Sequence, residues 1–198
     1  RDLGGTLVEV MHHRAMWMMI LLAAGASWFI SNSYQAQMPA FAQDIGHTDP
    51  GFTYSLLLAA DALGALCAGL LWEYVGARSP ATPRKAMIYA LVWAVSMGLF
   101  ALSGHYGLAV ILLFVAGFAE LTSNSTAQTI VQTSAPLHIR GRVIGLFNMS
   151  ALGLRFGSGL MVGVLGGWLG IHGSLLLACA GFLCFMGVLR LRFKPQLA

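Results

Sequence analysis

The chain has 198 residues, of which 58% are hydrophobic before its 24 glycines are counted, and only 9% are charged. A soluble domain is about 45–50% apolar with glycine included and about 25% charged, so this composition excludes a soluble globule. The same apolar content excludes a disordered chain, and we therefore expect the protein to fold in a lipid bilayer.

Residues 1–15 mix polar and apolar side chains and lack the apolar core of a signal peptide. We predict a short amphipathic helix that lies along the cytoplasmic membrane surface as a linker segment. The first residue is Arg and not Met, so we expect either that another segment precedes this one in the gene product or that the chain was processed.

A membrane span needs roughly 20 apolar residues to cross about 30 Å of hydrocarbon. Because the bilayer offers no water to backbone groups, stretches of this length are expected to be helices. The candidate spans are residues 16–41, 52–74, 86–104, 107–132, 143–169 and 173–191. The sequence thus predicts an all-α membrane protein, with six transmembrane helices over residues 16–192 and a cytoplasmic tail over residues 193–198.

The net charge of +4 reflects where the cations lie along the chain. Ten of the eleven Lys and Arg residues fall before the first span, between the second and third, between the fourth and fifth, or after the sixth. These regions lie on one side of a six-span bundle, and by the positive-inside rule that side is cytoplasmic. We therefore expect both termini in the cytoplasm and predict no nucleic-acid partner.

Three ionisable residues lie deep inside spans: Asp61 in the second, Glu120 in the fourth and Arg155 in the fifth. A charge at the bilayer centre costs about 2.5–3.5 kcal/mol on insertion scales, so these side chains should face a wet cavity or pair within the protein. A membrane carboxylate is also a candidate proton carrier, because desolvation favours its neutral form. Asp61 and Glu120 are therefore either proton-coupling residues or partners that neutralise Arg155.

The cytoplasmic half of the fourth span is strongly polar. Side chains that recur every four residues form a slowly winding stripe on one helix face, and they are Glu120, Asn124, Gln128 and Gln132. Such a face suits an aqueous pathway or a polar ligand. Interhelical hydrogen bonding is the alternative explanation for the same residue types.

The first and fifth spans add further polar candidates. Asn148 and Arg155 are seven residues apart and share a helix face, where Arg155 can hold an anionic substrate group or a structural counter-ion. Asn32 and Gln35 in the first span either line a cavity or serve interface anchoring and helix packing. The predicted substrate cavity comprises Asn32, Gln35, Glu120, Asn124, Gln128, Asn148 and Arg155.

Two further features concern packing. The third and sixth spans carry no ionisable residue between their ends, and we expect both to face lipid. The fifth span has glycines at small-xxx-small spacings, which favour close approach of a neighbouring backbone, or bending during gating. These are Gly153, Gly157, Gly159, Gly163 and Gly167.

The cytoplasmic end of the second span and the start of the fifth are expected to meet. Glu73 lies in the segment GLLWEYVGAR, and Arg140 and Arg142 precede the fifth span on the same side. A carboxylate stabilises a helix N-terminus, where free N–H groups carry partial positive charge. We therefore expect Glu73 to contact the start of the fifth span.

The segment GLLWEYVGAR resembles the gating-loop motif of the major facilitator superfamily, in which glycine, an acid, a second glycine and basic residues join helices of one half. The matching residues are Gly69, Leu71, Glu73, Gly76 and Arg78, whereas Tyr74 stands where the family usually has Arg. The later stretch from Asn124 to Gly159, with its proline and its RGR loop, resembles helices ten and eleven of the branch that contains the enterobactin exporter.

This resemblance implies the C-terminal six-helix half of a secondary active transporter, which works by alternating access with an N-terminal half. Helices seven, eight, ten and eleven of that fold line the cavity, and they correspond to the four spans with polar faces. The implied function is proton-coupled export of small molecules such as drugs or siderophores across a bacterial inner membrane. The expected partners are the bilayer, a small-molecule substrate, protons and the N-terminal half, without a cofactor.

Two other functions stay open on the sequence. One is a self-sufficient six-helix protein that acts as a homodimeric transporter or channel. The other is an intramembrane enzyme, but all six histidines lie near span ends or in loops, and Asp61 alone is an aspartate deep in a span. We predict no catalytic residue. The three cysteines have no CxxC spacing, so neither a disulfide framework nor a metal site is expected.

Overall fold

The computed structural model describes residues 3–31, 33–46, 49–76 and 80–194, which are almost entirely helical and contain no strand. Five helical segments are long and apolar enough to cross a membrane, and a bent pair of shorter helices brings the number to six. The elements are α1 (Leu3–His12), α2 (Arg14–Phe29), α3 (Ser33–Ile45), α4 (Pro50–Gly76), α5 (Pro83–Leu102), α6 (Tyr106–Ser134), α7 (Arg140–Asn148), the π-helical turn η1 (Met149–Gly153) and α8 (Arg155–Arg192). The protein is an all-α membrane protein.

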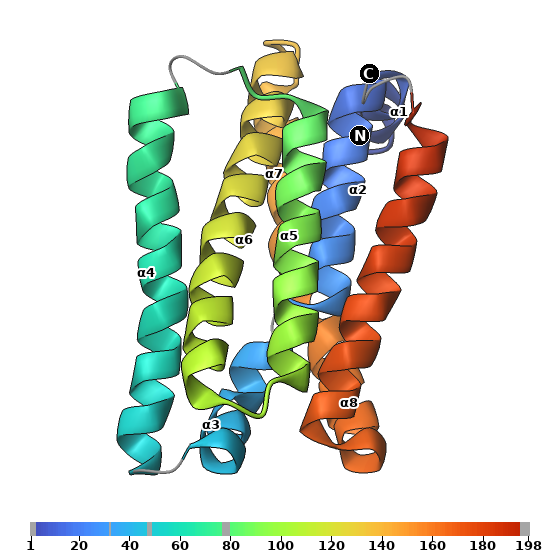
Figure 1. Cartoon of the computed structure of the whole chain (residues 1–198). Helices are drawn as coiled ribbons and strands as arrows, with labels where there is room; N and C mark the ends of the chain where they lie inside the picture. The colour runs from blue at the N-terminus through green and yellow to red at the C-terminus, as the bar shows by residue number, and fades with distance from the viewer. Residues whose placement is uncertain (1–2, 32, 47–48, 77–79, 195–198) are drawn as a thin grey trace.

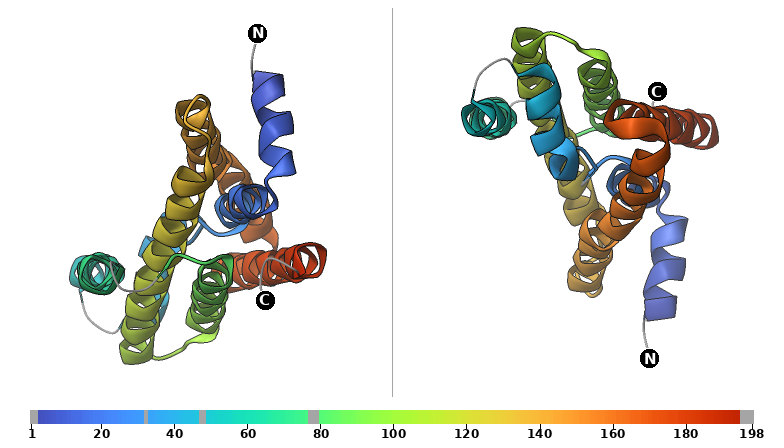
Figure 2. Two further views of the ribbon diagram at one scale, coloured as in Figure 1. Left: turned by 90° about the horizontal axis from the view of Figure 1, so that it is seen from above. Right: turned by 90° about the horizontal axis from the view of Figure 1, so that it is seen from below.

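The spans run side by side, with both termini at the same end of the bundle (Figure 1). Helix α1 lies across that end, since Figure 1 shows it end-on and Figure 2 shows it lengthwise. Its Val10 is buried, whereas Val8 and Met11 are exposed. Glu9 reaches the loop after α6 and lies 3.4 Å from His138. This arrangement fits a helix that rests on a membrane surface.

The first span is broken, which corrects the continuous helix expected over residues 16–41. Helix α2 ends at Phe29, and the N–H groups of Ile30 and Ser31 both donate to the carbonyl oxygen of Ala26. The chain then continues as α3, bent by 42° from α2. The residues between the two helices are Ile30, Ser31 and Asn32, and α3 begins at Ser33. Serine and asparagine side chains compete with helical hydrogen bonds, so this run favours a break.

The fifth span consists of α7, the π-helical turn η1 and the first part of α8. Helix α8 is interrupted at Gly170, whose φ of 70° and ψ of 178° are not helical. Glycine adopts this left-handed region without a steric penalty, and the chain reverses direction at the lower end of α8 (Figure 1). The sixth span then returns to the end of the bundle that holds the termini.

Helix α4 stands at one edge of the bundle and packs against α6 through two glycines. A Cβ atom on Gly64 would overlap the backbone of Phe114, and a Cβ atom on Gly117 would overlap the backbone of Asp61. Small residues allow this close approach of two helices within a membrane. Because Gly117 and Glu120 lie one turn apart on α6, the contact also brings Asp61 of α4 near Glu120.

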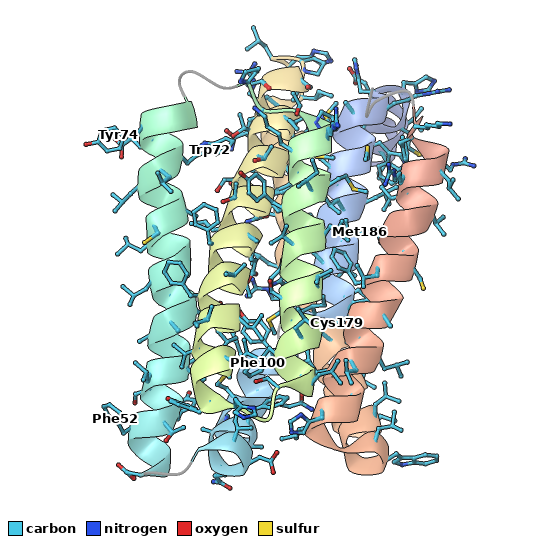
Figure 3. The ribbon with its side chains drawn as sticks, in the orientation of Figure 1. Phe52, Trp72, Tyr74, Phe100, Cys179 and Met186 are labelled. Carbon is cyan, nitrogen blue, oxygen red and sulfur yellow. The ribbon has the colours of Figure 1, made fainter. Side chains whose placement is uncertain are left out.

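The outer surface of the bundle is apolar, as a lipid-facing surface requires. Phe52 and Tyr74 of α4 are 65% and 80% exposed, and both point away from the bundle (Figure 3). Helix α5 exposes Leu91 and Leu99, and α8 exposes Val188. Such large exposed apolar side chains are unfavourable in water but match a hydrocarbon environment.

Candidate functional site: a central pocket beside two carboxylates

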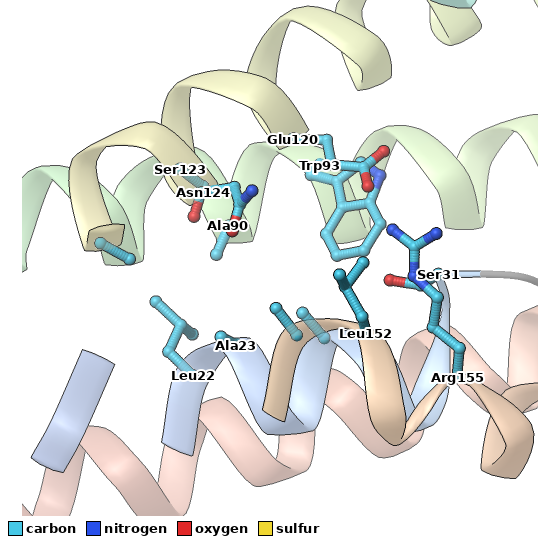
Figure 4. Close-up of a pocket in the computed structure, with 13 residues that line it drawn as sticks. Leu22, Ala23, Ser31, Ala90, Trp93, Glu120, Ser123, Asn124, Leu152 and Arg155 are labelled. Atoms are coloured by element: carbon cyan, nitrogen blue, oxygen red, sulfur yellow. The ribbon is translucent and has the colours of Figure 1, made fainter. Parts of the chain in front are cut away.

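A pocket lies inside the bundle between α2, α5, α6 and the segment from η1 into α8 (Figure 4). Its volume is about 80 Å³. The polar side chains that line it are Ser31, Glu120, Ser123, Asn124 and Arg155, and the remaining lining residues are Leu22, Ala23, Ala26, Ala90, Trp93, Ala127, Ala151 and Leu152. The π-helical turn η1 therefore contributes directly to the pocket, which agrees with the frequent occurrence of such turns at functional sites.

The two charged side chains in the pocket have opposite signs. Arg155 extends from the start of α8 toward Trp93 and Glu120 (Figure 4). It attracts Glu120 electrostatically, although the two form no direct ion pair in the part of the chain that the structure describes. The Nε–H of Arg155 and the Nε1–H of Trp93 are buried, and neither has an acceptor among the described residues. An unpaired N–H of the guanidinium group and an unpaired indole N–H near it suit an acceptor group of a polar ligand.

A tyrosine joins the carboxylates of α4 and α6. The hydroxyl of Tyr34, from α3, donates to Oδ2 of Asp61 at 3.1 Å and lies 3.4 Å from Oε2 of Glu120. Gln35 donates from Nε2 to the tyrosine oxygen at 3.4 Å. Because Tyr34 is buried and Glu120 lines the pocket, these contacts form a polar path from Asp61 to the pocket.

Tyr34 was not among the residues predicted from the sequence. Its neighbours Asn32 and Gln35 were, because amides inside a span are conspicuous, whereas tyrosine is common near span ends. The signal available was its place in the polar run Ser-Asn-Ser-Tyr-Gln inside an apolar stretch. Trp93 was missed as well, because the third span carries no ionisable residue between its ends and was expected to face lipid.

The structure brings together part of the predicted cavity. Glu120, Asn124 and Arg155 line the pocket. The predicted residues that lie elsewhere are Gln35, which contacts Tyr34, and Gln128 and Asn148, whose side chains do not reach the pocket. Asn32 lies outside the described residues.

Two helices play different parts from those expected. Helix α5 was expected to face lipid only, yet its Ala90 and Trp93 line the pocket while its opposite face is exposed. Helix α4 was expected to line the cavity, but none of its described side chains lines the pocket. Its Asp61 joins the site only through Tyr34. The reason is the position of α4 beyond α6, where the Gly64 and Gly117 contact holds it.

The glycines of the fifth span differ in their surroundings. A Cβ atom on Gly157 would overlap the indole ring of Trp28, so this glycine is needed for contact with α2. The other four have no atom of another element within 4 Å of such a Cβ, and they are Gly153, Gly159, Gly163 and Gly167. Close packing therefore explains one of the five glycines within the described chain.

The gating-loop residues do not meet in the described chain. Glu73 is exposed and forms no hydrogen bond or ion pair with Arg140 or Arg142, so the expected contact with the start of the fifth span is absent among the described residues. Arg140 instead donates from Nη2 to the carbonyl oxygen of Ala135 at 3.4 Å. Arg78 lies outside the described residues.

The described residues show no cluster of three or more His, Cys, Asp or Glu side chains that could hold a metal ion. The cysteines Cys67, Cys179 and Cys184 are all free thiols. The ionisable side chains at and beside the pocket are Asp61, Glu120, Arg155 and Tyr34.

Comparison with known families identifies the fold. Residues 3–158 match the family model of the Major Facilitator Superfamily, which covers most of the chain. The chain belongs to the major facilitator superfamily. Members of this superfamily are transporters, so the present protein is a membrane transporter. A search of curated proteins gave no match.

Proposed function

We propose that this chain is the C-terminal half of a secondary active transporter, a proton-coupled exporter of small molecules that works by alternating access with an N-terminal half. The observation that carries the proposal is the path from Asp61 through Tyr34 to Glu120, which faces Arg155 across the pocket. The resemblance to the branch that contains the enterobactin exporter suggests drugs or siderophores as substrates and a bacterial inner membrane as the location.

The tyrosine provides a means of moving one proton between two carboxylates. The Tyr34 hydroxyl has a single proton, so it can donate fully to only one of Asp61 and Glu120 at a time. A proton that binds to the pair removes the repulsion between two anions held close together. A transfer of this proton between the two carboxyl groups changes the charge that Glu120 presents to the pocket.

Substrate charge then determines the direction of coupling. When Glu120 gains a proton, its attraction for Arg155 is lost, and the pocket becomes more positive by one unit. An anionic substrate therefore binds together with a proton, whereas a cationic substrate competes with the proton. The effect is mutual, because the linkage between two ligands is reciprocal. Export by proton exchange through this site requires a substrate with a cationic group near Glu120.

The small size of the pocket supports the proposal that an N-terminal half completes the substrate cavity. Its volume of about 80 Å³ is well below the roughly 300–1,000 Å³ of a site for a drug-sized ligand. We propose that the larger cavity forms where the fifth span faces the N-terminal half, because four glycines of that span have open space beside them. The pocket would then hold one functional group of the substrate.

Transport by the reconstituted full-length protein tests the proposal. A panel of drugs and siderophores is first screened in proteoliposomes that contain a pH-sensitive dye, which identifies a substrate by the proton flux it causes. We expect Asp61→Asn and Glu120→Gln to abolish gradient-driven transport while substrate exchange at equal pH continues. Asp49→Asn, which removes an exposed carboxylate outside the site, is the control. Unchanged gradient-driven transport in both variants would remove these carboxylates from coupling.

Glu73→Ala tests the proposed gating loop. Because Glu73 lies at the end of α4, far along the helix from Asp61, we expect it to affect conformational exchange and not the pocket. The variant should transport several-fold more slowly with nearly unchanged substrate affinity, as measured by initial rates and equilibrium binding. A large loss of affinity with normal cycling would contradict the assignment.

A further inference from the structure

A groove separate from the central pocket lies between α5 and α8. Its volume is about 560 Å³. Arg84 and Arg190 lie at one end of its lining, and Met87, Leu91, Leu183 and Met186 form much of the remaining wall. Trp93 of α5 packs against Phe182 of α8, with 5.8 Å between ring centroids, and so separates the groove from the pocket.

Each wall of the groove is one face of a helix. The α5 wall runs from Arg84 through Met87 to Leu91, and the α8 wall runs from Leu183 through Met186 to Arg190. These spacings of three, four and seven residues place the side chains in line along the helix. Seven residues of helix span about 10 Å, so each wall is a strip of roughly that length. An arginine lies at one end of each strip, and apolar side chains form the rest.

The groove widens toward the end of the bundle that holds the termini. Lower down, the two helices are in contact, and a Cβ atom on Gly98 would lie 3.8 Å from Cys179. Figure 1 shows α5 and α8 separating from there toward their upper ends, and Figure 3 places Met186 in this upper region. Arg84 lies in the first turn of α5 and Arg190 in the last turn of α8, so both guanidiniums occupy the open end.

The two arginines have no counter-ion among the residues that the structure describes. Both are exposed, and in the described ranges neither forms an ion pair or a hydrogen bond with another side chain or carbonyl group. Two guanidiniums at the rim of an apolar groove present a charge that the described part of the chain leaves uncompensated. Guanidinium groups bind phosphate with two parallel hydrogen bonds, and basic pockets between helices at the cytoplasmic face bind anionic lipid headgroups.

We propose that this groove binds an anionic phospholipid of the cytoplasmic leaflet. Its phosphate lies between Arg84 and Arg190, and one acyl chain lies along the apolar strips of α5 and α8. The charge complementarity argues for an anionic headgroup, and the apolar strips argue for a lipid and against a soluble phosphate compound, which would leave them uncovered. The site lies on the outer face of α5, which the proposed transport function does not use, and it rests on the predicted cytoplasmic orientation of the termini.

Native mass spectrometry of the purified full-length protein tests this site. The probes are phosphatidylglycerol and phosphatidylcholine with the same oleoyl chains, so that only the headgroup differs. We expect phosphatidylglycerol to bind more tightly, by about fivefold for each arginine that contacts it. Arg84→Gln with Arg190→Gln should remove this preference. Arg192→Gln with Lys194→Gln is the control, because it removes two charges at the same end of the bundle from residues that do not line the groove.

A second pair of variants tests the apolar wall without altering charge. Gly187 lines the groove, and no atom of another element lies within 4 Å of a Cβ built on it. Gly187→Phe should fill the groove and weaken binding of phosphatidylglycerol at least tenfold, whereas Gly187→Ala should have little effect. The melting temperature and size-exclusion profile of each variant establish that it is folded.

Several results would overturn the proposal. Equal affinity for the two lipids would show that the arginines do not select a headgroup. Equal losses in the two double variants would indicate diffuse surface attraction, and normal binding by Gly187→Phe would place the lipid elsewhere. Glycerol phosphate that binds as tightly as the lipid would identify a site for soluble phosphate compounds.

Discussion

At the scale of single residues, Tyr34 determines how the two membrane carboxylates are held. It supplies the one hydrogen bond that Asp61 receives at Oδ2, while Asp61 Oδ1 is buried without a donor among the described residues. Gln35 donates to the tyrosine oxygen and so leaves its proton directed toward the carboxylates. The hydroxyl is therefore needed both to stabilise Asp61 and to link it to Glu120.

Tyr34→Phe removes this hydroxyl and keeps the ring. We expect a loss of about 1.5–3 kcal/mol in the free energy of unfolding, because a charged acceptor loses its buried donor. Gradient-driven transport should fall, while exchange at equal pH continues. Thermal unfolding in detergent and proteoliposome assays measure the two effects. Tyr89→Phe is the matched control, since no hydrogen bond of its hydroxyl occurs in the described chain; an equal loss in both variants would contradict a specific role for Tyr34.

At the scale of helices, the contact of α4 with α6 positions the carboxylates. Gly64 and Gly117 bring the two backbones together within one turn of Asp61 and Glu120. The acids come from helices that approach each other only because both carry glycine at the crossing point. Helix packing thus sets the separation between the two carboxylates and holds them close together against their mutual repulsion.

Gly117→Ala should separate α4 from α6, because the added methyl group would overlap the backbone of Asp61. We expect a loss of about 1–3 kcal/mol in the free energy of unfolding, together with reduced proton coupling. Gly107→Ala, on the same helix but in open space, is the control and should be neutral or slightly stabilising. Unfolding in detergent and gradient-driven transport provide the readouts; a fully stable and coupled Gly117→Ala variant would exclude this role for the glycine contact.

At the scale of the whole molecule, the two ends of the bundle differ in chemistry. Apart from Arg155 in the pocket, the described Lys and Arg residues lie on helix ends at the end of the bundle with the termini, where α1 also crosses the bundle (Figure 1). At the other end, His172 of α8 joins α3 and α5, with Nε2 at 2.8 Å from Asp44 Oδ2 and Nδ1 at 2.5 Å from the carbonyl oxygen of Ala101. The first end thus collects cations, and at the second end a histidine links three helices.

Reporter fusions test the predicted orientation. The positive-inside rule leads us to expect that a fluorescent protein that folds only in the cytoplasm will fluoresce when fused after Ala198. Alkaline phosphatase, which is active only outside the cytoplasm, should be active when inserted between α5 and α6, at Gly104. Fluorescence and phosphatase activity of intact cells measure both. A reversed pattern would place the termini outside and would remove the basis of the proposed lipid site.

The sequence alone determines the solvent, the helical class, the approximate spans and the end of the bundle that collects the cations, because apolar length and charge placement act locally along the chain. It also identifies Asp61, Glu120 and Arg155, since a charge within a span is conspicuous anywhere. The rotation of each helix about its own axis is not determined by the local sequence. Packing alone decides that Trp93 faces the pocket, that α4 reaches the site only through Asp61, and that Tyr34 joins two carboxylates from different helices. These features depend on where small residues such as Gly64 and Gly117 let distant segments touch, and only the tertiary structure specifies that.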